Sequence, residues 1–63
     1  MKQKNMKLIS AREAKGYTQQ HVADLIELSL RQYQRYENEE KIPNVIISKK
    51  LANMFNTSIE SLF

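Results

Sequence analysis

Arginine and carboxamide side chains recur at helical spacing between residues 30 and 38. At roughly 100° per residue, one side of a helix would carry Leu30, Arg31, Gln34, Arg35 and Asn38. Arginine can bind guanine through two hydrogen bonds, glutamine and asparagine suit adenine, and leucine can touch the methyl group of thymine. A polar helix face is also typical of an ordinary solvated surface, so the residue types leave both interpretations open.

Two details of this face favour contact with a partner. It carries no acid, although neighbouring segments carry several, and Leu30 would be an exposed apolar residue in the first turn. The other side of the same helix would carry Ser29, Tyr33, Tyr36 and Glu37. We therefore expect the tyrosines in the core, where their hydroxyl groups need a partner or water.

The helix with this face is predicted to begin at Ser29, because Ser29 and Gln32 form an S-x-x-Q capping box. A preceding helix is predicted to begin at Thr18, whose hydroxyl can accept a hydrogen bond from the first turn. Only Glu27 and Leu28 separate the two helices, so they must cross steeply, which is the geometry of a helix-turn-helix.

The remaining turn and cap signals complete an all-α chain. Gly16 and Asn56 suit left-handed helix ends, Pro43 precedes the cap residue Asn44, and Thr57 forms a second capping box with Glu60. We expect a compact five-helix fold with helices at about 5–14, 18–26, 29–38, 44–55 and 58–62. The expected core faces of the fourth and fifth helices carry Val45, Ile47, Leu51, Ala52, Phe55, Ile59, Leu62 and Phe63.

Length and composition exclude several classes of protein. With 63 residues the chain is expected to be a single domain, 1–63, close to the smallest size that folds without a covalent or metal staple. Cysteine is absent, which excludes disulfides and thiolate metal sites, and no apolar run approaches a membrane span or signal peptide. We expect a soluble cytoplasmic protein with no membrane partner, and the net charge of +3 favours a polyanionic one.

Catalytic and cofactor chemistry has no support in the sequence. His21 is the only histidine, and Asp24 one turn later supplies too few ligands for a metal. There is no glycine-rich phosphate loop and no nucleophile with a paired base. We expect no enzyme activity, no metal, no cofactor and no small-molecule substrate.

The order of these signals resembles the Cro and lambda-repressor-like helix-turn-helix family, also called the XRE type. The similarity covers about Leu8 to Phe63. It rests on Arg12 with Gly16, Thr18-Gln19, Val22-Ala23, Ser29, the Tyr33 and Tyr36 spacing with Glu37, Pro43 and Leu51-Ala52.

The resemblance implies residue roles. Gln19 would hold a phosphate and brace the reading helix, Arg12 and Glu37 would form a structural ion pair, and Gln32 and Lys41 would lie near the DNA backbone. Ser29, Leu30, Arg31 and Arg35 would lie over bases, with Gln34 within reach. The implied DNA-binding set is Thr18, Gln19, Ser29, Leu30, Arg31, Gln32, Gln34, Arg35 and Lys41.

The sequence departs from the family pattern around the reading helix. Glu27 replaces the usual glycine of the tight turn, and because a left-handed non-glycine residue costs on the order of 1 kcal/mol, we expect a slightly different turn. Glu39 replaces a common glycine, and Glu39-Glu40 place acids where many members offer cations to phosphate. Lys41 is then the one cation expected to reach phosphate from this loop.

The function implied is a sequence-specific, double-stranded DNA-binding transcriptional regulator. We expect a nucleoid-associated repressor of phage, prophage or bacterial type, which binds a palindromic operator as a homodimer and can meet an antirepressor or corepressor. Ile59, Leu62 and Phe63 could form part of the dimer surface or belong to the core. The alternative is a protein-interaction module of the same fold, an antirepressor or antitoxin-like partner, which the acids Glu37, Glu39 and Glu40 favour.

Overall fold

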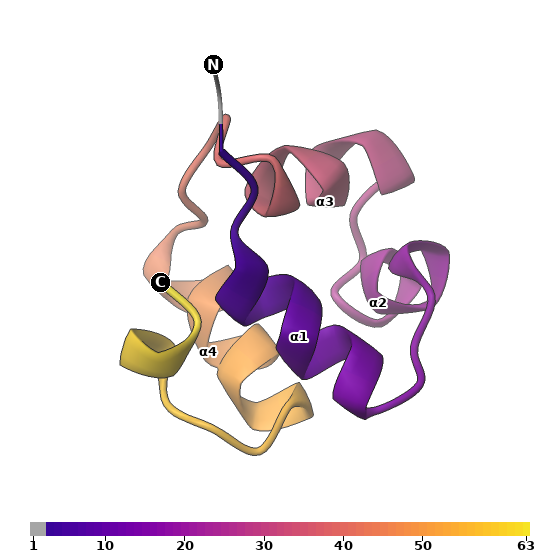
Figure 1. Cartoon of the computed structure of the whole chain (residues 1–63). Helices are drawn as coiled ribbons and strands as arrows, with labels where there is room; N and C mark the ends of the chain where they lie inside the picture. Colours follow the sequence, from indigo (N-terminus) through magenta and orange to yellow (C-terminus); the bar gives the residue numbers. More distant parts are fainter. Residues whose placement is uncertain (1–2) are drawn as a thin grey trace.

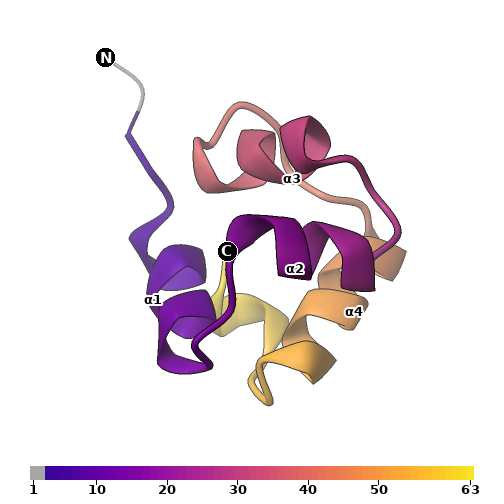
Figure 2. The ribbon, with the colours of Figure 1, turned by 90° about the vertical axis from the view of Figure 1, so that its right-hand side faces the viewer.

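The computed structural model describes residues 3–63, and within them the backbone forms α-helices and no strand (Figure 1). The elements, in chain order, are α1 (Met6–Ala14), α2 (Gln19–Leu25), α3 (Leu30–Glu37), α4 (Val45–Met54) and the short 3-10 helix η1 (Ile59–Ser61). In Figures 1 and 2, α3 lies at one side of the molecule and α4 at the opposite side.

The predicted starts of α2, α3 and α4 are confirmed, because each cap residue binds a free amide of the first turn. The hydroxyl of Thr18 accepts a hydrogen bond from the His21 N–H at 3.0 Å, and Asn44 caps α4 in the same way. Both halves of the capping box at α3 are present: Ser29 Oγ accepts from the Gln32 N–H, and Gln32 Oε1 accepts from the Ser29 N–H.

All four α-helices of the described chain end in a Schellman motif, in which a left-handed residue follows the cap. After α2, for example, the Leu28 N–H donates to the Ala23 carbonyl at 2.9 Å and the Glu27 N–H to the Asp24 carbonyl at 3.1 Å. The left-handed residues are Gly16, Glu27, Glu39 and Asn56, with φ of 73°, 61°, 57° and 53°.

The expectation of a different turn at Glu27 is wrong, since Glu27 adopts the left-handed conformation that glycine takes most easily. The next residue, Leu28, is partly buried and packs on the core. Burial of Leu28 and the two hydrogen bonds of the motif therefore offset a local backbone cost on the order of 1 kcal/mol.

Every α-helix and η1 contribute to one hydrophobic core. Tyr33 and Tyr36 are buried in it, as predicted, and their rings meet edge to face at 6.4 Å. The buried apolar residues are Leu8, Val22, Ala23, Ile26, Tyr33, Tyr36, Leu51, Ala52, Phe55 and Leu62. This core places α3 so that its opposite side is left uncovered.

Two parts of the predicted fold are wrong. The fifth helix is not an α-helix, because η1 contains only three residues and is capped by Ser58, whose hydroxyl accepts from the Ser61 N–H, rather than by Thr57. Thr57 is used instead in the Schellman motif of α4, where its N–H binds the Ala52 carbonyl. Val45 is 66% exposed, because it lies in the first turn of α4 beyond the core.

No helix in the described part of the chain combines the length and apolar character needed to cross a membrane.

We predict that Glu27→Gly stabilises the protein. Removing the side chain relieves the left-handed strain, so the free energy of unfolding should rise by about 1 kcal/mol in chemical denaturation. Glu27→Gln is the matched control, because it removes the charge and keeps the Cβ atom, and it should leave stability nearly unchanged. An equal gain from both variants would assign the effect to charge.

Candidate nucleic-acid interface

The outer side of α3 presents the side chains that the sequence placed there. Arg31 and Arg35 are exposed, and Gln34 and Asn38 are half-buried. These four residues line one polar depression together with Glu40. The face therefore offers guanidinium N–H bonds, about five per arginine, and those amide N–H bonds of Gln34 and Asn38 that are not used within the protein, all of the kind that read base edges.

The inner side of α3 is fixed by a buried carboxylate. Glu37 is 2% exposed and accepts hydrogen bonds from three side chains on three different helices. The donors are Arg12 Nε at 2.6 Å, Gln19 Nε2 at 2.8 Å and the Tyr33 hydroxyl at 2.5 Å. Arg12 also donates through Nη1 to the Tyr17 carbonyl at 2.8 Å, which fixes its orientation.

Gln19 connects this network to the outer face. Its amide nitrogen donates to Glu37, and its amide oxygen accepts from Gln34 Nε2 at 3.1 Å. A continuous chain of hydrogen bonds therefore runs from the buried carboxylate through α2 to Gln34 on the polar depression. The geometry gives Gln19 a bracing position against α3, and Gln34 a fixed amide orientation.

The network also shifts the pKa values of Arg12 and Tyr33. Burial opposes the charge of Arg12, but the hydrogen bond to Glu37 and the negative charge of Glu37 together raise the pKa of Arg12 above its ordinary value. Burial, then the hydrogen bond and charge of Glu37, raise the pKa of Tyr33 well above its ordinary range. Tyr33 therefore remains a neutral donor and Arg12 a cation at neutral pH.

The other predicted site residues lie around α3 in three settings. Ser29 and Gln32 are exposed and occupied with capping α3, and Leu30 beside them is half-buried. Thr18 is exposed and caps α2. Lys41 is exposed on the segment after α3. It does not line the polar depression but a second cavity, together with Glu39, Ile42 and Phe63.

Sequence reasoning missed two residues that organise this region. Asn5 is buried, its N–H donates to the Glu37 carbonyl at 2.7 Å, and its side chain donates to the Leu62 carbonyl at 2.7 Å. The signal for Asn5 was its preference for helix caps, since it also caps α1. Glu40 was noticed as an acid, but its position beside the arginines depends on the turn that precedes it.

We predict that Glu37→Gln destabilises the fold by about 3 kcal/mol, because an amide removes the charge that pairs with Arg12 and points N–H groups at the remaining donors. Tyr33→Phe removes one donor and should cost less, about 2 kcal/mol. Chemical denaturation measures both. Glu60→Gln, the same change at an exposed carboxylate, is the control. A Glu37→Gln midpoint equal to that of Glu60→Gln would contradict the importance of the buried charge.

Comparisons with known proteins agree with this geometry. Residues 8–62 match the family model described as Helix-turn-helix. The chain is similar to a solved structure, the restriction-modification controller protein C.AhdI from Aeromonas hydrophila, with a TM-score of 0.80 and 25% sequence identity over 94% of this chain and 89% of that one. No curated protein matches the sequence. The chain therefore belongs to the XRE-type helix-turn-helix family of DNA-binding transcriptional regulators.

Proposed function

We propose that this protein is a repressor that binds a palindromic operator as a homodimer, with α3 in the major groove. The observation that carries the proposal is the division of α3 into two sides. Glu37 and the tyrosines are buried on one side, and Arg31, Arg35 and the amide of Gln34 are gathered on the other. A helix held rigidly from behind keeps its outward groups in place for base edges.

Each outward residue has a specific proposed contact. Arg31 and Arg35 bind guanine O6 and N7, Gln34 binds adenine, and Leu30 and Ser29 contact bases at the amino end of α3. The half-buried position of Leu30 suits a methyl contact that excludes water. Backbone contacts are proposed for Thr18 and Gln19 at the start of α2, for Gln32 on α3 and for Lys41 on the segment after it.

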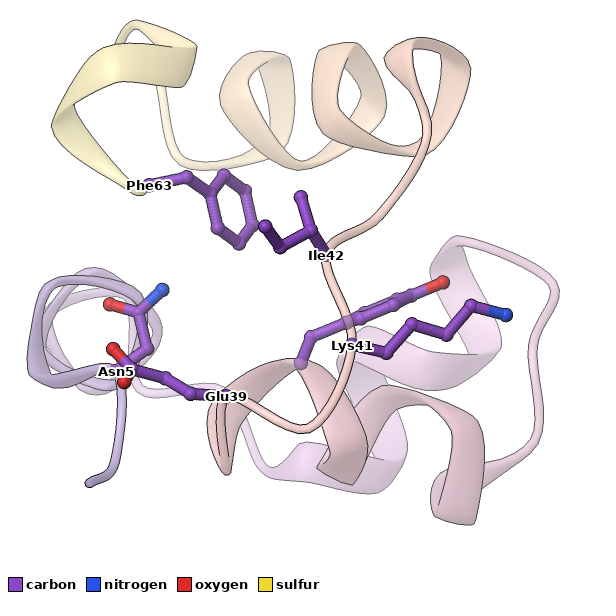
Figure 3. Close-up of a pocket in the computed structure, with 6 residues that line it drawn as sticks. Asn5, Glu39, Lys41, Ile42 and Phe63 are labelled. Carbon is purple, nitrogen blue, oxygen red and sulfur yellow. The ribbon is translucent and has the colours of Figure 1, made fainter. Parts of the chain in front are cut away.

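An exposed apolar corner of the molecule supports the dimer. Of the residues proposed earlier for a dimer surface, Leu62 is core, Ile59 is partly buried on it and Phe63 remains 39% exposed. Phe63 lies against Ile42, which is 82% exposed, at the mouth of a cavity of about 260 Å³ (Figure 3). Val45 and Ile46, which follow Ile42 by three and four residues in the chain, are also exposed, and we call Ile42, Val45, Ile46 and Phe63 together the apolar corner.

A second copy of the chain fits this corner by charge as well. The cavity beside Phe63 is lined by both Glu39 and Lys41, which carry opposite charges. In a twofold interface the same patch meets itself, so Glu39 of one protomer can face Lys41 of its partner. A palindromic operator with half-sites about 10 bp apart requires this twofold arrangement.

We predict that Arg31→Ala and Arg35→Ala each lower the affinity for the preferred operator by about 1 to 3 kcal/mol and reduce sequence preference. The operator is first selected from a random DNA pool, and titration with the selected and a scrambled duplex measures the loss. Lys50→Ala, which removes one exposed charge from α4, is the control and should keep the preference. Equal preference in wild type and both arginine variants would contradict the assignment.

The salt dependence of binding tests the other candidate, a protein-interaction module. The exposed apolar corner and the adjacent acids are the observations that favour it. Binding of DNA through Arg31, Arg35 and backbone contacts should weaken steeply between about 50 and 200 mM salt. Binding of a protein to the apolar corner should change little over the same range.

We predict that Ile42→Ser weakens self-association at least tenfold, or about 1.4 kcal/mol, because it removes the most exposed apolar side chain of the corner. Sedimentation equilibrium of the wild type and of Ile42→Ser measures the change in the dimer dissociation constant. Leu25→Ser is the matched control, since Leu25 is 49% exposed on α2. Equal dissociation constants for the two variants would exclude the apolar corner as the dimer interface.

A further inference from the structure

Glu40 stands beside the two arginines that are proposed to read DNA. It lines the same polar depression as Arg31, Gln34, Arg35 and Asn38. The Asn38 amide nitrogen lies 3.5 Å from Glu40 Oε2, at the outer limit of a hydrogen bond. A negative charge is therefore built into the rim of an otherwise cationic surface.

The turn after α3 fixes this position. Glu39 is left-handed, with φ of 57°, and the Glu40 N–H donates to the Arg35 carbonyl at 2.9 Å. The chain is thereby folded back over the end of α3, with the Glu40 backbone bound to the residue that carries one of the two guanidinium groups. Glu39 itself lines the other cavity, where its side chain lies beside Asn5 (Figure 3). Adjacent acids therefore have separate environments.

We propose that Glu40 is a specificity-determining residue that acts as an internal competitor for the arginines of α3. The proposal rests on the reading face described under the proposed function. Affinity for any DNA sequence comes mostly from cations that neutralise phosphates, and a carboxylate beside two guanidinium groups offsets part of their field. Glu40 therefore lowers the affinity for DNA of arbitrary sequence.

The correct operator overcomes this competition through hydrogen bonds that other sequences lack. Guanine presents two acceptors to one arginine, and these two hydrogen bonds offset the loss of affinity that the nearby carboxylate causes. A duplex without guanine at these positions offers each arginine no such pair of base acceptors, so its binding depends more on phosphate, which Glu40 repels. Glu40 thus lowers the affinity for all DNA sequences, but it lowers the affinity for the operator least. The ratio of specific to nonspecific affinity therefore rises.

The test compares Glu40→Gln with Glu13→Gln in the full chain. Glu13 is exposed on α1, whose carboxyl end lies away from α3 in Figures 1 and 2, and its change alters net charge equally. Titrations use the selected operator and a scrambled duplex of equal length at one salt concentration. We expect Glu40→Gln to tighten binding to the scrambled duplex on the order of fivefold and to the operator less than twofold. Glu13→Gln should change neither by more than about twofold.

Three outcomes would overturn the role of Glu40. Equal effects of Glu40→Gln and Glu13→Gln on the affinity for the scrambled duplex would show that only the net charge of the protein matters, not the position of Glu40. Weaker operator binding by Glu40→Gln with unchanged scrambled binding would make Glu40 a direct base contact. Absence of DNA binding by all three proteins would remove both proposals. Equal binding of the wild type to both duplexes would contradict the proposal that α3 reads bases, but not the proposal for Glu40. The effect of Glu40→Gln on the scrambled duplex would still test whether Glu40 lowers nonspecific affinity.

Discussion

The buried carboxylate of Glu37 is the interaction on which the arrangement of the helices depends. Removing a carboxylate from water costs several kcal/mol, which is offset only when its oxygens are fully hydrogen-bonded. Here the donors come from α1, α2 and α3, through Arg12, Gln19 and Tyr33. Any shift of one helix would leave the charge short of a donor. The network therefore selects one relative position of three helices in a chain with a small apolar core.

The same carboxylate explains why α3 can present a cationic surface. The helix carries one acid, Glu37, and that acid points into the protein, where Arg12 balances its charge. Arg31 and Arg35 on the outer side are thus not neutralised from within their own helix. Gln34 shares the outer side but is tied to the interior through Gln19. The outer face therefore combines charge with a rigid amide, and both properties come from the inner network.

Local signals predicted the starts of α2, α3 and α4, because a cap depends on a side chain and amides within one turn, as at Thr18 and Ser29. They also predicted the two sides of α3 from its period. They failed where distant packing decides the conformation. Glu27 is left-handed because Leu28 packs on the core, and η1 is too short to propagate an α-helix. The position of Glu40 beside the arginines depends on the turn after α3, and the spacing of residues in the sequence does not predict that turn.

The glutamates around α3 show that stability alone does not explain this surface. Glycine would be less strained than Glu27 or Glu39, since both are left-handed, and each glutamate costs on the order of 1 kcal/mol. The strain at Glu39 accompanies the turn that brings Glu40 to the arginines. A chain selected only for stability and tight phosphate binding would carry glycine and cations at these positions. Acids retained there at a cost in stability fit a surface that limits indiscriminate attraction to DNA, which is the role proposed for Glu40.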